Sequence, residues 1–185
     1  MKKYWKKYRN VLFYVILLTI LFVPAVRFPV QVFLQNLLSF SPSSISVEER
    51  EVLADYDYQL MDLYGNNVNL KDFKNQVIVI NFWATWCPPC VAEMPAFQKL
   101  YNDYQQEVAF FFISNDPIDK VNAFADKKNF QLPFFQPMSQ EPSKLRYTAL
   151  PTTFVLTKAG EIVVRTEGAA NWNSKSFRAL LDDLK

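Results

Sequence analysis

The feature that most constrains the fold is an apolar run from Val77 to Trp83, VIVINFW, which leads directly into the motif ATWCPPC. β-Branched and aromatic residues fill this run almost without a polar break, which is typical of a strand buried on both faces of a sheet. Between Cys90 and about Gln106 the apolar residues recur at helical spacing. The sequence therefore predicts a buried strand, a tight turn that carries Cys87, and a helix.

The rest of the chain alternates strands and helices in the same way. Strands are predicted at residues 56–63 and 108–114, and a helix is predicted to begin at Asp116-Pro117 with Asp116 as its capping residue. The segments LPTTFVL and EIVVRTE flank TKAG and predict a hairpin, and a last helix is predicted at residues 174–184. We expect one α/β domain over residues 51–185.

A basic segment and an apolar segment precede this domain. Residues 1–10, MKKYWKKYRN, are basic, whereas residues 11–26 are uncharged and would span roughly 24 Å as a helix. We expect residues 11–26 to form a single transmembrane helix in the cytoplasmic membrane, with the N-terminus in the cytosol and the domain in the periplasm or extracytoplasmic space. The alternative is a signal peptide cleaved near Ala25. Residues 27–50 are predicted to form a juxtamembrane segment that ends in a Ser/Pro-rich tether.

Charge and composition exclude several classes of function. Six of the 20 basic residues precede residue 28, which leaves 14 basic against 18 acidic residues in the rest of the chain. We therefore expect no nucleic-acid partner. The chain has no histidine, which excludes Ser-His and Cys-His nucleophile pairs and any site that needs a histidine ligand. No metal and no cofactor is expected.

The cysteine pair can serve as a structural staple, a metal clip or a reactive pair. A staple that closes so short a loop removes little entropy from the unfolded chain, and a structural zinc site needs about four ligands. A reactive pair is favoured because Cys87 lies where the helix begins, and free N–H groups and the helix dipole favour a thiolate there. We expect Cys87 to be the exposed nucleophile and Cys90, one turn inward, to be the resolving thiol.

The motif FWATWCPPC after an apolar strand, followed by a helix and later by LPTTF, resembles the thioredoxin-fold superfamily. More narrowly, it resembles the membrane-anchored thiol–disulfide oxidoreductases of the TlpA/ResA type, over roughly residues 55–185. This resemblance implies a thioredoxin-like fold with a central mixed sheet flanked by helices. It also implies that Leu150-Pro151 is a cis peptide facing the cysteines and that both residues help to bind substrate. We expect Trp86, beside Cys87, to cover the disulfide and contact substrate.

Glu93 is the candidate acid–base residue, because it follows Cys90 by three residues and so lies on the same face of the helix. Cytosolic thioredoxins carry a buried aspartate six residues before the first cysteine, where this chain has Asn81, which cannot titrate. Glutamate at the place of Glu93 is usual in proteins of the TlpA/ResA type. We predict that Glu93 has a raised pKa and relays the Cys90 proton. The alternative is an acid that merely interacts with the dipole of the first helical turn.

The resemblance implies a reductant of disulfide-containing client proteins. The extracytoplasmic space is oxidising, so a reductant there needs a transmembrane thiol electron donor. The Pro-Pro pair between the cysteines contains no histidine, unlike the oxidants and isomerases of the superfamily, and this favours the reducing direction. In relatives a common client is the haem-binding cysteine pair of apocytochromes c, so the resemblance implies cytochrome c maturation as one expected setting.

Three other functions remain as alternatives. The first is a thiol peroxidase, although Ile80 and Ala84 stand where peroxide-reducing relatives carry a proline and a threonine. The second is a thioredoxin-fold oxidant or isomerase. The third is a non-catalytic binding module, against which the intact cysteine pair argues.

Overall fold

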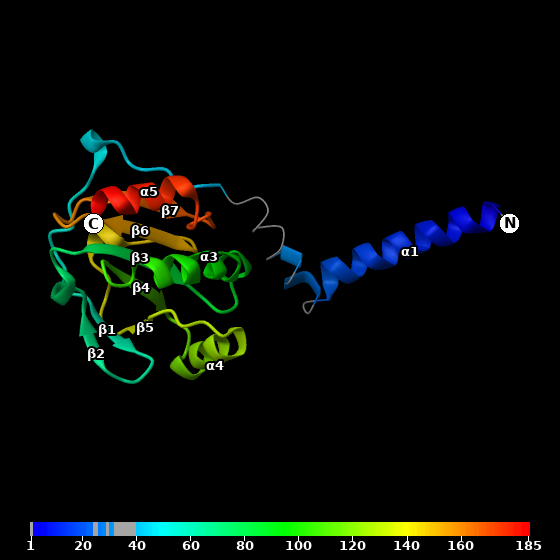
Figure 1. Cartoon of the computed structure of the whole chain (residues 1–185). Helices are drawn as coiled ribbons and strands as arrows, with labels where there is room; N and C mark the ends of the chain where they lie inside the picture. Colours follow the sequence, from blue (N-terminus) through cyan, green and yellow to red (C-terminus); the bar gives the residue numbers. More distant parts are fainter. Residues whose placement is uncertain (1, 24–25, 29, 32–39) are drawn as a thin grey trace.

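The computed structural model describes residues 2–23, 26–28, 30–31 and 40–185. Figure 1 shows a long N-terminal helix, α1 (Lys2–Phe22), and a domain built around one sheet. The sheet contains the strands β1 (Gln59–Asp62), β2 (Asn67–Asn69), β3 (Val77–Trp83), β4 (Val108–Ser114), β5 (Phe134–Pro137), β6 (Thr152–Leu156) and β7 (Ile162–Glu167). The α-helices of the domain are α3 (Pro88–Tyr104), α4 (Ile118–Lys128) and α5 (Lys175–Leu184), and the short 3-10 helices are η1 (Val47–Glu49), η2 (Leu70–Phe73) and η3 (Ser143–Leu145).

The sheet is mixed, with the strand order β2-β1-β5-β4-β3-β6-β7. β3 pairs in parallel with β4 and antiparallel with β6, and β6 continues antiparallel to β7. Every residue of β3 and β4 is buried, as expected for central strands covered on both faces. The predicted mixed sheet and the predicted hairpin of β6 and β7 are therefore confirmed.

The two faces of the sheet are covered differently. Val77 and Val79 of β3 belong to a core that includes apolar residues of α3, α4 and α5. Ile78 and Ile80, which point to the other face, belong to a second core formed with residues of β1, η2 and η3. The three α-helices of the domain thus contribute to one core, and η2 and η3 contribute to the other.

One strand boundary and one capping residue differ from the sequence predictions. The first strand is shorter than the predicted 56–63, because its pairing with β2 and β5 is limited to Gln59–Asp62. The predicted capping role of Asp116 is wrong. Pro117 is the N-cap of α4. The Asp116 carboxylate instead accepts hydrogen bonds from Thr85, in the loop after β3.

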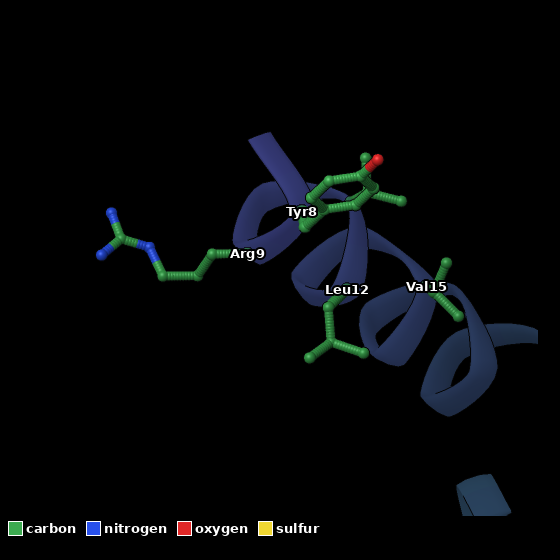
Figure 2. Close-up of a pocket in the computed structure, with 5 residues that line it drawn as sticks. Tyr8, Arg9, Leu12 and Val15 are labelled. Atoms are coloured by element: carbon green, nitrogen blue, oxygen red, sulfur yellow. The ribbon is translucent and has the colours of Figure 1, made fainter. Parts of the chain in front are cut away.

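Helix α1 carries apolar side chains on all sides. The residues from Val11 to Leu18 are between 40% and 61% exposed, and Phe22 is 76% exposed. Figure 2 shows Tyr8, Leu12 and Val15 on this helix, where they line a hollow. The described residues that line this hollow all belong to α1, and they include no group of catalytic side chains.

Among the described helices, none combines the length and the apolar character needed to cross a membrane. The predicted transmembrane segment, residues 11–26, includes residues 24 and 25, which lie outside the described part of the chain. Much of the predicted juxtamembrane segment 27–50 also lies outside it, at residue 29 and residues 32–39.

Candidate active site

The two cysteines form a disulfide at the start of α3, with their Cα atoms 5.3 Å apart. β3 carries the chain to this point, and a short loop after Trp83 places Cys87 at the N-cap of the helix. A buried strand that ends at a helix N-terminus holds the disulfide on two rigid elements. The strand-turn-helix arrangement predicted from VIVINFW and CPPC is confirmed.

The helix N-terminus presents one N–H group to the outer sulfur. Cys90 N donates to Cys87 Sγ at 3.3 Å, and Val91 N already donates to the carbonyl of Cys87 at 3.1 Å. Pro88 and Pro89 have no N–H to offer. The electrostatic stabilisation of a Cys87 thiolate therefore comes from one amide and the helix dipole, and not from a full turn of free N–H groups.

Cys87 is more accessible than Cys90, although less than the sequence suggested. The exposed fraction is 4% for Cys87 and 0% for Cys90, so the prediction of an exposed nucleophile is wrong for this disulfide form. Cys87 nevertheless lines an open hollow on the surface. A thiol or disulfide of another molecule can thus approach Cys87 but not Cys90.

The predicted substrate-binding residues only partly meet at this hollow. Its described lining residues are Trp86, Cys87, Pro88, Pro89, Tyr147, Thr148, Ala149 and Leu150. Trp86 and Leu150 are among them, and Trp86 is 62% exposed. Coverage of the disulfide by Trp86 stays a prediction. The Leu150-Pro151 peptide is cis, as the resemblance implied. Pro151 itself is buried and is not among the described lining residues.

Glu93 is buried below the disulfide, with an exposed fraction of 2%. Its Oε1 accepts a hydrogen bond from Asn81 Nδ2 at 2.8 Å. Its Oε2 accepts from Trp172 Nε1 at 2.7 Å and from Ala170 N at 3.3 Å. Residues from β3, α3 and the connection between β7 and α5 therefore converge on one carboxyl group.

The environment of Glu93 changes its proton affinity strongly. Burial in the core disfavours the charged form and raises the pKa of Glu93 to about 8, although the hydrogen bonds from Trp172, Asn81 and Ala170 oppose this rise. A carboxyl with such a pKa exchanges a proton near neutral pH. The pKa direction predicted for Glu93 agrees with the structure, whereas the alternative of a first-turn acid does not, because the first turn of α3 contains no acidic residue.

Asp116 is a site residue that the sequence interpretation missed. Its Oδ2 accepts hydrogen bonds from Thr85 N at 2.7 Å and from Thr85 Oγ1 at 2.8 Å, and Lys120 pairs with Oδ1 at 3.2 Å. Burial opposes ionisation of Asp116, but these hydrogen bonds together lower its pKa. The Asp116 carboxylate thus fixes the loop that leads to Cys87.

Replacing Asp116 with alanine is expected to loosen this loop. The change leaves the Thr85 N–H without its partner, and removal of hydrogen bonds to a charged group should lower the free energy of unfolding by about 2–3 kcal/mol. Urea unfolding of the oxidised protein measures this loss, with Asp119→Ala as the control for an acidic residue on the first turn of the same helix. An equal, small effect of both changes would contradict the role of Asp116.

Metal ligands do not gather at this site. Within the described residues, no group of three or more His, Cys, Asp or Glu side chains is placed to hold a metal ion.

A Cys-Pro-Pro-Cys disulfide at a helix N-terminus, next to a cis-proline loop on a mixed sheet, defines a thioredoxin-like protein. The chain belongs to the AhpC/TSA family, whose sequence profile matches residues 54–165.

Two individual proteins show which members of this family the chain is similar to. The chain is 33% identical to the thioredoxin-like protein YneN of Bacillus subtilis over 128 residues, which cover 67% of this chain and 74% of YneN. It is 31% identical to the thiol-disulfide oxidoreductase ResA of Halalkalibacterium halodurans over 129 residues, 68% of this chain and 73% of that protein. Thiol-disulfide oxidoreductase, the enzyme class of ResA, is also the class predicted for this chain from its cysteine pair.

A solved structure supports the fold. The crystal structure of a DsbF homologue from Corynebacterium diphtheriae superimposes with a TM-score of 0.61 and 20% sequence identity, covering 78% of this chain and 93% of that chain. At this identity the likeness shows that the two proteins share the thioredoxin-like fold.

Proposed function

We propose that this protein is a membrane-attached thiol–disulfide oxidoreductase that reduces disulfides in client proteins outside the cytoplasm. The observation that carries the proposal is the asymmetry of the disulfide, whose outer sulfur lines an open hollow while the inner sulfur is buried. One sulfur is thus available to clients, and the other is reserved for resolution. The similarity to ResA supports the same chemistry.

The reaction transfers two electrons from the reduced protein to the client. The Cys87 thiolate attacks a client disulfide, forms a mixed disulfide and releases the first client thiolate. Cys90 then loses its proton and attacks Cys87 Sγ. The second client sulfur leaves as a thiolate, and the Cys87–Cys90 disulfide of the structure is formed.

Glu93 has the role of proton acceptor in the second step. Cys90 must become a thiolate before it can attack, and burial in the core disfavours that charge. Glu93 follows Cys90 by one turn of α3 and is buried with it. The proton passes from Cys90 to the ionised fraction of Glu93, which grows as the pH approaches the Glu93 pKa of about 8, and this proton relay is part of the proposal.

The reducing direction is supported by the start of α3. Among the described residues, Cys90 N is the one hydrogen-bond donor to the outer sulfur. The Cys87 thiolate therefore receives less stabilisation than a histidine or a further free amide would provide. A less stabilised thiolate makes the dithiol a stronger reductant. We extend the proposal to a transmembrane thiol electron donor and to paired-cysteine clients such as apocytochromes c.

The buried apolar side chains at Ile80 and Ala84 favour this function over a thiol peroxidase. Neither side chain can donate a hydrogen bond to a peroxide.

The reduction potential tests the direction of electron transfer. Equilibration of the full chain with dithiothreitol or glutathione buffers is expected to give a value near or below about −230 mV, in the range of thioredoxin-like reductants. Fluorescence of Trp86, which lies beside the disulfide, is a convenient readout. A value between about −120 and −180 mV would instead identify an oxidant or isomerase.

Membrane attachment is supported by the surface of α1. Consecutive apolar residues from Val11 to Leu18 are exposed on every side of the helix, and a helix that is apolar all round is stable in a core or in a lipid bilayer. The basic residues before it are suited to the cytosolic side of a membrane.

Cell fractionation is expected to place the full chain in the membrane pellet, resistant to carbonate washing and released by detergent. A variant without residues 1–40 is its control and should be recovered in the soluble fraction. Mass spectrometry of the purified protein distinguishes an uncleaved anchor, which retains residues 1–25, from a cleaved signal peptide. Recovery of the full chain without detergent would contradict the proposed attachment.

A further inference from the structure

The hydrogen bonds around Glu93 leave one buried atom without a partner. Asn81 Nδ2 donates both to Glu93 Oε1 and to Thr153 Oγ1, each at 2.8 Å. Asn81 Oδ1, on the other side of the same amide, has no hydrogen-bond partner among the described residues, and Asn81 is 0% exposed. An unpaired buried acceptor is unfavourable and requires an explanation.

The two oxygens of Glu93 differ in what their neighbours can do. Oε2 faces the indole N–H of Trp172 and the backbone N–H of Ala170, and both groups can only donate. Oε1 faces the Asn81 amide, whose nitrogen and oxygen have nearly the same size and can exchange places by a half-turn of the side chain. Among these described partners, a proton on Glu93 finds an acceptor only at Oε1, and only if Asn81 turns.

We infer that the Asn81 amide reverses when Glu93 takes up a proton, and that Asn81 and Trp172 are positioning residues that direct the proton to Oε1. This inference rests on the proposed proton relay. In the reversed state the new Glu93 Oε1–H donates to Asn81 Oδ1. The Thr153 hydroxyl, which can donate as well as accept, turns to donate to the same oxygen.

The proton balance of this step is simple. During resolution the S–H bond of Cys90 breaks, the O–H bond of Glu93 forms, and the electron pair of the S–H bond remains on sulfur for the attack on Cys87. The amide turns without gaining or losing a proton. Asn81 Nδ2 moves to the place of the oxygen that lacks a partner in the carboxylate state.

Glu93 is the only charged group in this arrangement of described residues. Along α3 the facing titratable group is Cys90, one turn earlier, and the neighbours from β3, β6 and the β7–α5 connection are Asn81, Thr153 and Trp172, all neutral. The Trp172 ring is stacked on Phe97 at 5.1 Å and meets Phe177 edge-on at 5.1 Å. Packing thus fixes the Trp172 indole N–H that donates to Glu93 Oε2. The side chain that changes its orientation is therefore Asn81.

A pH titration of the oxidised full chain by ¹H–¹⁵N NMR in detergent micelles tests the inference without turnover. The Asn81 side-chain NH₂ resonances and the Trp172 indole N–H resonance are expected to move with one shared midpoint. In the carboxylate state both Asn81 N–H groups are hydrogen-bonded, and in the acid state they lose these partners, so their shifts should change strongly upfield. Glu93→Gln should abolish the shared transition.

A pair of tryptophan variants separates positioning from packing. Trp172→Phe removes a donor that stabilises the carboxylate, so the Asn81 transition should move to higher pH by about one unit or more. Trp83→Phe is the matched control, because Trp83 is buried but its Nε1 has no partner among the described residues. The control should leave the midpoint unchanged. The wild-type titration decides the inference even if a variant fails to fold.

Two results would overturn the inference. If the Trp172 resonance titrates while the Asn81 resonances do not shift, Glu93 accepts protons without the reversal of Asn81. The inference is then wrong, and the proposed relay is kept without it. If neither resonance moves between pH 5 and pH 10, Glu93 does not exchange a proton, and the relay fails with the inference. Failure of the oxidoreductase function itself is seen separately, as the absence of client disulfide reduction by the reduced wild-type chain.

Discussion

Replacing Cys87 with serine is expected to reduce client disulfide reduction to the uncatalysed rate. A serine hydroxyl at this position has no adjacent base and does not attack a disulfide, and Cys90 is 0% exposed and cannot substitute for it. The fold should persist, because a disulfide that closes so short a loop contributes little to stability. Reduction of insulin disulfides by the reduced chain measures the loss.

Cys90→Ser is the matched control for this prediction. It retains the attacking thiol and removes the resolving one, so the mixed disulfide with a client should accumulate at Cys87 and be visible as a mass increase. If Cys87→Ser retained turnover, or if the Cys90→Ser variant trapped no client, the assigned roles of the two sulfurs would be wrong.

Replacing Glu93 with glutamine is expected to remove a pH dependence of stability. In the folded protein Glu93 holds its proton up to a pKa of about 8, whereas the ordinary value is 4.5. Between these values the unfolded chain has lost the proton that the folded chain retains, so the wild-type free energy of unfolding falls as pH rises through this window and levels off above it. The loss amounts to at most about 5 kcal/mol.

Thermal unfolding of the oxidised protein at pH 5 and pH 8.5 measures this effect. Wild type should lose stability between the two values, and Glu93→Gln should lose much less, because the amide stays neutral. Glu107→Gln is the control, since Glu107 forms an exposed ion pair with Lys185 and should retain the wild-type slope. Parallel slopes in wild type and Glu93→Gln would show that Glu93 is ionised throughout and would remove the basis for a relay.

The sequence predicted the elements whose signals are local. The run Val77–Trp83 is continuous and apolar, and it is a central strand with every residue buried. The hairpin of β6 and β7 and the final helix also follow from short-range patterns, and Ser174 caps α5 by accepting from Phe177 N at 3.3 Å. Turn residues, strand-forming residues and capping residues act over a few positions, which is why one sequence was enough to place these elements.

The contacts that define the site are long-range, and no local pattern reveals them. Trp172 lies 79 residues from Glu93 and Asp116 lies 31 residues from Thr85. Asp116 before a proline has the signature of a helix cap, yet its carboxylate forms hydrogen bonds to the loop before Cys87. Local chemistry allowed both uses of Asp116, and tertiary packing selected the second one.

The outer edge of β7 also has a consequence for how the domain behaves when it is cut from the chain. Ile45 N donates to Val163 O at 2.8 Å, Ile162 N donates to Glu51 O at 2.8 Å, and Leu53 N donates to Gly160 O at 2.9 Å. The segment before the domain thus occupies backbone groups that an edge strand would otherwise offer to another molecule. A fragment that began at residue 51 would uncover part of this edge and invite strand-to-strand aggregation, whereas one that began near residue 40 would keep it covered.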